Sequence, residues 1–265
     1  MTLIVCAFKQ EASLIKKRLS LKKIDDNKFE IFSNSKYILI ISGIGKIKSS
    51  IATTYIFAKF QIDYAVNFGF AGGVSDISEL FLINKIFDIS TDSYFFPDIL
   101  LDLDMRESSL SSFDRVVTKS DIDSLKTELV DMEASAFFEA SSKFLALNSI
   151  AVLKIVSDNF SSDFLSKDFI DSLLEKNIDR VLYFLESFSF QTKSFLSVEV
   201  LKKLDTIYSN LHFTTTQKSL ILNLSKYHFI RFNNLDILDS FLDIKTESKN
   251  EAKKVFKNLE NELSK

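Results

Sequence analysis

All five glycines of this 265-residue chain lie in two short segments, and each segment follows an apolar run that is typical of a buried strand. The first segment is 43–46, after the run 37–42, and the second is 69–73, after the run 64–68. Glycine permits positive φ angles and lets the backbone approach another group closely. Because glycine is absent elsewhere in the sequence, we expect these two strand-end loops to mark a site.

Strand-like and helix-like patterns alternate from the N-terminus onward. The strand-like runs are residues 3–7, 28–33, 37–42, 64–68, 82–90 and 114–118. The acidic, serine-rich stretch 100–112 is typical of a loop, and 164–188 of a long amphipathic helix. Another helix is expected after Lys46, with Ile47, Ile51, Tyr55 and Ala58 at helical spacing. The alternation predicts an α/β fold with a mixed central sheet, since the turn at 34–35 joins two neighbouring strands.

The sequence changes character after Gln191. Ser197 and Thr214 begin helix-like runs, and Gln217 stands at capping-box spacing from Thr214. A charged helix is expected over 245–265. We therefore predict an α/β domain over 1–188 and a small all-helical C-terminal extension over 189–265.

Composition excludes several classes of protein. The net charge of -3 gives no strong signal for nucleic-acid binding. The single cysteine, Cys6, cannot form an internal disulfide, which is typical of a reducing compartment. No signal peptide or membrane-spanning apolar run is present, so a cytoplasmic protein is expected. His212 and His228 lack companion ligands at metal-binding spacing, so no metal or cofactor is expected.

Three acidic residues stand where apolar runs end: Glu11, Glu133 and Asp158. Open α/β folds place ligand chemistry at the carboxyl ends of their strands. Acidic residues also cap helix N-termini, so each of the three could serve structure alone. Lys46, at the start of a predicted helix, is expected to be a solvated lysine.

The sequence resembles the nucleoside phosphorylase/nucleosidase superfamily, and most closely the methylthioadenosine/S-adenosylhomocysteine nucleosidases. The matching segments occur in the order of that family and cover residues 1 to about 185: they are 7–11, 42–46, 67–73, 88–93 with Asp98, 130–134 and 157–159. This resemblance implies a three-layer α/β sandwich that cleaves the N-glycosidic bond of a purine nucleoside. It also implies a homodimer.

The resemblance implies a role for each acidic residue. Asp158 matches the acid that protonates the departing purine, and Glu11 matches the carboxylate that accepts a proton from the attacking water. Glu133 and Met132 match the residues that hold the ribose. The other residues expected to contact the nucleoside are Gly45, Phe70, Ala71, Gly72 and Ser157. Lys154 stands where relatives often carry arginine, and is expected to orient Asp158.

Departures from the family leave three functions open. Asn67 stands where phosphorylases place an arginine, so hydrolysis is favoured over phosphorolysis. Phe68 and Phe70 replace small hydroxylic residues, so a nucleoside-binding or partner-binding subunit without catalysis is the alternative from another class. In that case the helical tail would dock an unknown protein. The expected walls of the pocket are Tyr94, Phe95, Phe96 and the segment 117–122.

Overall fold

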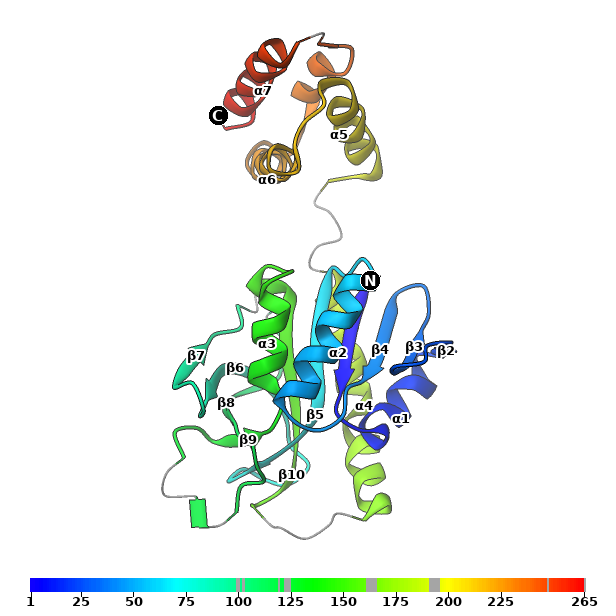
Figure 1. Cartoon of the computed structure of the whole chain (residues 1–265), viewed down its shortest axis with the longest axis vertical. Helices are drawn as coiled ribbons and strands as arrows, with labels where there is room; N and C mark the ends of the chain where they lie inside the picture. The colour runs from blue at the N-terminus through cyan, green and yellow to red at the C-terminus, as the bar shows by residue number, and fades with distance from the viewer. Residues whose placement is uncertain are drawn as a thin grey trace. The chain divides into compact units, whose positions relative to one another are not determined.

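The computed structural model describes residues 1–98, 101, 103–118, 120–121, 125–160, 166–190, 196–246 and 248–264. The chain divides into two compact units, Met1–Gln191 and Thr192–Lys265. Each unit is described by itself, and Figure 1 gives the element labels.

The first unit is built on one mixed sheet (Figure 1). Its described strands are β1 (Thr2–Cys6), β2 (Lys22–Ile24), β3 (Glu30–Ser33), β4 (Tyr37–Ile41), β5 (Tyr64–Gly73), β6 (Leu80–Asp88), β7 (Ser93–Phe95), β8 (Arg106–Ser112), β9 (Leu129–Asp131) and β10 (Ile150–Asp158). The order is β10-β6-β8-β9-β5-β1-β4-β3-β2, with β7 beside β6. Since β10 also pairs with β5, five of these strands close into a ring.

Two pairs of helices cover opposite faces of this sheet (Figure 1). Helices α1 (Lys9–Arg18) and α4 (Lys167–Phe190) cover one face, and α2 (Lys46–Lys59) and α3 (Ala134–Ser142) cover the other. Side chains of β1 alternate between the two cores because successive residues of a strand point to opposite faces. Ile4 packs under α1 and α4, whereas Leu3 and Val5 pack under α2 and α3. The predicted three-layer α/β fold is confirmed.

The second unit is all-helical, as predicted. It contains α5 (Val198–Leu211), α6 (Thr215–Phe232) and α7 (Lys249–Leu263), which enclose a core of their own. Ser197 caps α5, and Thr214 forms the expected capping box with Gln217 at the start of α6. In the part of the chain that is described, every helix is too short or too polar to cross a membrane.

Three of the predicted elements are wrong. Residues 69–73 belong to strand β5 rather than to a loop. The stretch 106–112 is strand β8, while 114–118 has no strand conformation. Ser108, Ser111 and Ser112 of β8 are buried and make hydrogen bonds, such as that between Ser108 and Glu128, so a polar composition does not prevent a strand here.

Helix α2 forms where it was expected but buries a different face. Ile47 and Ile51, which the pattern placed in phase, are 75% and 55% exposed. Ala52 and Ile56 are fully buried against the sheet instead. Small side chains on the inner face let the helix approach the sheet closely, so two isoleucines are left on the outside.

We expect Phe184→Ala to destabilise the first unit by about 3–5 kcal/mol, because Phe184 is fully buried between α4 and the sheet and its loss leaves a cavity. Urea denaturation measures this change. Tyr183→Ala is the matched control, since Tyr183 is the preceding residue of α4 and is 62% exposed. Equal losses in the two variants would contradict this assignment of the core.

Candidate active site

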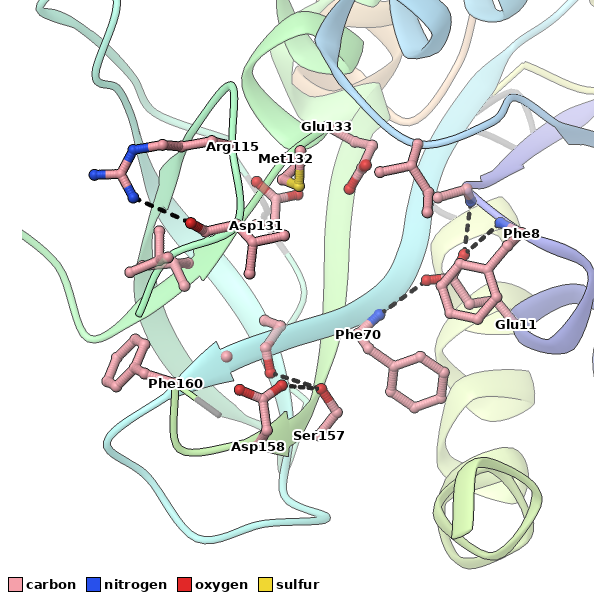
Figure 2. A pocket seen from close by; sticks show the side chains of 17 residues that line it. Phe8, Glu11, Phe70, Arg115, Asp131, Met132, Glu133, Ser157, Asp158 and Phe160 are labelled. Carbon is pink, nitrogen blue, oxygen red and sulfur yellow. Dashed lines mark hydrogen bonds between the residues drawn. The ribbon is translucent and has the colours of Figure 1, made fainter. Parts of the chain in front are cut away.

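A cavity of about 180 Å³ lies where β1, β5, β9 and β10 end (Figure 2). It brings together the three predicted acids, whose carboxylates lie on different sides of it (Figure 2). The other predicted site residues that line it are Phe70, Ala71, Gly72, Met132 and Ser157. Gly45 does not line the cavity, but its backbone contacts Glu133. Residues far apart in the sequence therefore meet at one edge of the sheet.

Glu11 lies in the first turn of α1 and is buried. Its Oε2 accepts hydrogen bonds from the backbone N–H groups of Ala7 and Phe8 at 2.6 and 3.1 Å, and its Oε1 accepts one from Phe70 at 3.1 Å. A Cβ atom on Gly69 would lie 2.5 Å from Oε1, so the strand needs glycine there. Burial raises the pKa of Glu11 to about 7, although Lys154 and the backbone donors oppose this. A carboxyl group with this pKa can exchange a proton near neutral pH.

Glu133 is the residue directly before α3 and is 6% exposed. Its Oε1 accepts a hydrogen bond from the backbone N–H of Gly45 at 2.8 Å. Gly45 has φ 105°, a conformation that glycine adopts without strain. Burial and the neighbouring Asp131 raise the pKa of Glu133, whereas Lys154 and the Gly45 N–H oppose the shift.

Asp158 lies at the end of β10, on a different side of the cavity from Glu11 (Figure 2). The Oγ of Ser157 lies 2.8 Å from Asp158 Oδ2 and 3.4 Å from the carbonyl oxygen of Ala71, and its proton can go to either. A Cβ atom on Gly72 would lie 3.2 Å from Asp158 Oδ1. Glycine at this position of β5 therefore leaves room for the carboxylate.

Lys154 does not contact Asp158, and that expectation is wrong. Four residues of extended strand span about 13 Å, which separates the two side chains along β10. The Nζ of Lys154 instead lies 2.8 Å from Asp131 Oδ2, and both side chains are almost fully buried. Asp131 also accepts hydrogen bonds from Ser112 Oγ at 2.6 Å and from the backbone N–H of Ala134 at 2.9 Å.

The carboxylates around Lys154 favour its charged form and raise its pKa. Burial lowers its pKa, but Asp131, Glu133 and Glu11 outweigh burial and raise it. Sequence reasoning missed Asp131. The signal was its place at the end of a strand-like run, two residues before Glu133.

Phe68 and Phe70, which replace small hydroxylic residues of the family, do not block the cavity. Phe68 is 1% exposed and packs in the core under α1 and α4. The ring of Phe70 lies beside that of Phe8, with 6.1 Å between the centroids, and packs against the same core. Phe70 therefore lines one side of the cavity and does not fill it.

The prediction that Tyr94, Phe95 and Phe96 line the cavity is wrong. Strand β7 pairs with β6, and none of these three residues is among those that line the cavity. Tyr94 packs on Phe87 and Phe95 on Phe138, outside the cavity. The observed wall includes Val117, as predicted. It also includes residues that the sequence did not indicate: Phe8, Ile44, Arg115, Val116 and Phe160. Residues 119 and 122 of the predicted wall lie outside the described residues.

The part of the chain that is described contains no cluster of three His, Cys, Asp or Glu side chains arranged to hold a metal ion. The acidic groups of the cavity are instead held by backbone N–H groups, hydroxyl groups and one lysine. This arrangement suits proton transfer and hydrogen bonding to a neutral polar ligand.

Comparison with curated proteins finds short matches to nucleosidases. The 5′-methylthioadenosine/S-adenosylhomocysteine nucleosidase of Colwellia psychrerythraea is 33% identical over 75 residues, which cover 26% of this chain and 31% of that protein. The nucleosidase of the same name from Buchnera aphidicola is 38% identical over 77 residues, which cover 27% and 33%. The chain thus spans about a third of the length of these curated relatives. No protein-family model matches.

Solved structures with the same fold cover about 70% of this chain. A 5′-methylthioadenosine/S-adenosylhomocysteine nucleosidase from S. pneumoniae, solved with a transition-state inhibitor, has a TM-score of 0.60 at 20% identity, covering 70% of this chain and 99% of that one. Futalosine hydrolase of Helicobacter pylori has a TM-score of 0.56 at 21% identity, covering 71% and 96%. The predicted nucleoside phosphorylase/nucleosidase fold is therefore confirmed.

The raised pKa of Glu11 predicts a pH dependence of stability. The folded state keeps the Glu11 proton up to about pH 7, whereas the unfolded state loses it near the ordinary value of 4.5. The free energy of unfolding should therefore fall by about 3 kcal/mol as the pH rises through this window. We expect Glu11→Gln to remove this fall in urea denaturation between pH 4 and 8. Glu139→Gln, on the exposed side of α3, should keep it. Parallel curves for wild type and Glu11→Gln would contradict the assignment.

Proposed function

We propose that this chain hydrolyses the N-glycosidic bond of a purine nucleoside related to methylthioadenosine or S-adenosylhomocysteine. The observation that carries the proposal is the convergence of Glu11, Glu133 and Asp158 on one cavity, each in a different environment. The nucleosidase names of the relatives and of the solved structures with the same fold support it.

In the proposed reaction, the bond between the ribose and the purine breaks while both electrons leave with the base. Asp158 is the proposed general acid: a proton passes from its carboxyl group to the purine ring and neutralises the departing base. Ser157 fixes the orientation of the Asp158 carboxyl group through its hydroxyl, 2.8 Å from Oδ2. The purine is then expected to lie against the wall formed by Val116, Val117 and Phe160.

Glu11 is the proposed base. A water molecule forms the new bond to the anomeric carbon, and Glu11 accepts the proton that this water loses. A pKa of about 7 lets the ionised form exist at neutral pH and still bind a proton strongly. The backbone donors from Ala7, Phe8 and Phe70 fix the carboxylate in place.

Glu133 is the proposed ribose-binding residue. The Glu133 carboxylate lines the cavity and accepts the Gly45 N–H at Oε1, and its remaining lone pairs are proposed to accept the ribose hydroxyls. Met132, also in the cavity wall, would pack its apolar thioether against the sugar.

The alternative reaction, phosphorolysis, finds less support. Arg115 is the cation among the described residues that line the cavity, and it is bound to Asp121; the buried Lys154 is bound to Asp131. Asn67, where a phosphorylase would place an arginine, donates to the carbonyl oxygen of Val5 at 3.2 Å and is buried. A phosphate group would therefore lack a free bidentate donor among the described residues of the cavity.

The remaining expectations stand as further proposals. A homodimer is supported by the exposed isoleucines of α2, Ile47 and Ile51. We also propose two domains, 1–188 and 189–265, a cytoplasmic location, and a protein partner for the helical extension. The third functional alternative, a subunit without catalysis, is less favoured because Phe70 does not fill the cavity.

Asp158→Asn should lower kcat by roughly 10²–10⁴-fold while leaving the fold intact, because the amide cannot supply the proton to the base. Chromatographic detection of free adenine from methylthioadenosine, with and without phosphate, measures this. The control is Asp92→Asn, whose side chain is 79% exposed. Wild-type rates in Asp158→Asn would refute the role of Asp158, and strict dependence on phosphate would identify a phosphorylase.

Glu133→Gln should raise the KM for methylthioadenosine and lower kcat/KM by about tenfold or more, because an NH₂ group would replace an acceptor of the ribose hydroxyls. Binding of free adenine, measured by calorimetry, should change little because adenine has no ribose. Glu139→Gln, on the exposed face of the same helix, is the control. An equal loss of adenine binding would place Glu133 near the base instead.

A further inference from the structure

Lys46, the first residue of α2, is not the solvated lysine that the sequence indicated. Its side chain is only 11% exposed. The Nζ lies 3.1 and 3.0 Å from the two carboxylate oxygens of Asp88, at the end of β6, and 2.8 Å from Ser90 Oγ. Lys46 therefore joins the start of a helix to the end of a strand.

Asp88 links Lys46 to the helix that carries Glu133. Asp88 is 6% exposed and accepts a short hydrogen bond from Ser135 Oγ. Ser135 is the second residue of α3, and Glu133 directly precedes this helix. Glu133 in turn accepts the N–H of Gly45, which directly precedes Lys46. The contacts form a closed ring through Lys46, Asp88, Ser135, Glu133 and Gly45.

A second branch runs from Lys46 to the wall of the cavity. The Nζ lies 3.2 Å from Asp114 Oδ1, and Asp114 also accepts a short hydrogen bond from Ser90 Oγ. Asp114 directly precedes the segment 115–117, which lines the cavity. One ammonium group thus connects the carboxylate proposed to bind ribose with the wall proposed to contact the base.

The charge of Lys46 is needed because Asp88 is a buried anion. Burial raises the pKa of Asp88, but hydrogen bonds from Ser135 and Lys46 and from the backbone outweigh it and lower the pKa. Lys46 is the only cation that the described residues bring into an ion pair with Asp88. A neutral side chain would leave a buried carboxylate beside Ser135, and water or a shift of α3 would have to compensate.

We propose that Lys46 is a positioning residue for nucleoside binding, because it holds Glu133 and the segment 115–117 in a fixed relation to each other. The inference rests on the proposed function as far as the ligand is concerned. The ring of contacts itself can be tested without any ligand.

The test compares Lys46→Met with Lys59→Met in the full-length chain. Lys59 is the last residue of the same helix and binds Asp26, whose side chain is only 5% exposed, so this control also removes the cation from a nearly buried carboxylate. Two readouts are needed: the hydrogen-exchange rate of the Gly45 amide, and the KM and kcat for methylthioadenosine.

We expect Lys46→Met to raise the KM about tenfold with a smaller change in kcat, and to speed exchange of the Gly45 amide about tenfold. Lys46→Arg, which keeps the charge and the donors, should restore much of both. Lys59→Met should match the wild type in both readouts. Wild-type exchange and KM in Lys46→Met, or the same changes in Lys59→Met, would overturn the proposal.

Failure of the proposed function gives a different result. If the wild-type protein cleaves no purine nucleoside, the proposed function fails, and exchange of the Gly45 amide still decides whether Lys46 holds Glu133. If Lys46→Met does not fold, Ser135→Ala cuts the same ring at one hydroxyl group and is measured in the same way. If the Gly45 amide of a folded Ser135→Ala variant exchanges as slowly as in the wild type, the proposed role of this ring of contacts is overturned.

Discussion

The site depends on one buried cation among three buried carboxylates. Lys154 contacts Asp131 directly, and its charge opposes the burial that raises the pKa of both Glu11 and Glu133. Removing one member of a buried ion pair costs about 3–5 kcal/mol, because the remaining charge has no partner. The positive charge of Lys154, on β10, therefore stabilises the buried carboxylates of Glu11, Asp131 and Glu133 at this edge of the sheet.

The site also depends on two glycines of β5, Gly69 and Gly72, whose lack of a side chain leaves space for carboxylates. At Gly69 the absent Cβ atom leaves the space that the carboxylate of Glu11 occupies, and at Gly72 it leaves space beside Asp158. Both positions lie in the regular strand β5, so these glycines serve close approach to the carboxylates rather than a turn. The apolar core on either side of the sheet then holds the strands that carry these groups.

Sequence patterns predicted what depends on local chemistry. The apolar runs located most of the strands. Glu11 and Asp158 converge because they follow β1 and β10, which run parallel to β5, so the ends of these strands share one edge of the sheet. Glu133 joins them because β9 pairs antiparallel with the last residues of β5. The patterns failed where long-range contacts decide. The partner of Lys154 is on another strand, and the charge of Lys46 is matched by Asp88, 42 residues away. Strand β8 was missed because its serines are satisfied by tertiary hydrogen bonds that composition does not reveal.

The same arrangement explains why acids rather than a metal would suit the proposed reaction. As the N-glycosidic bond breaks, the ribose gains positive charge while the purine gains negative charge. The carboxylates of Glu11, Glu133 and Asp158 lie on different sides of the cavity (Figure 2). Carboxylates near the sugar can stabilise the developing cation, and a general acid near the base can donate the proton that neutralises the anion. The separation of these acids, enforced by different strands, thus matches the separation of charge in the transition state.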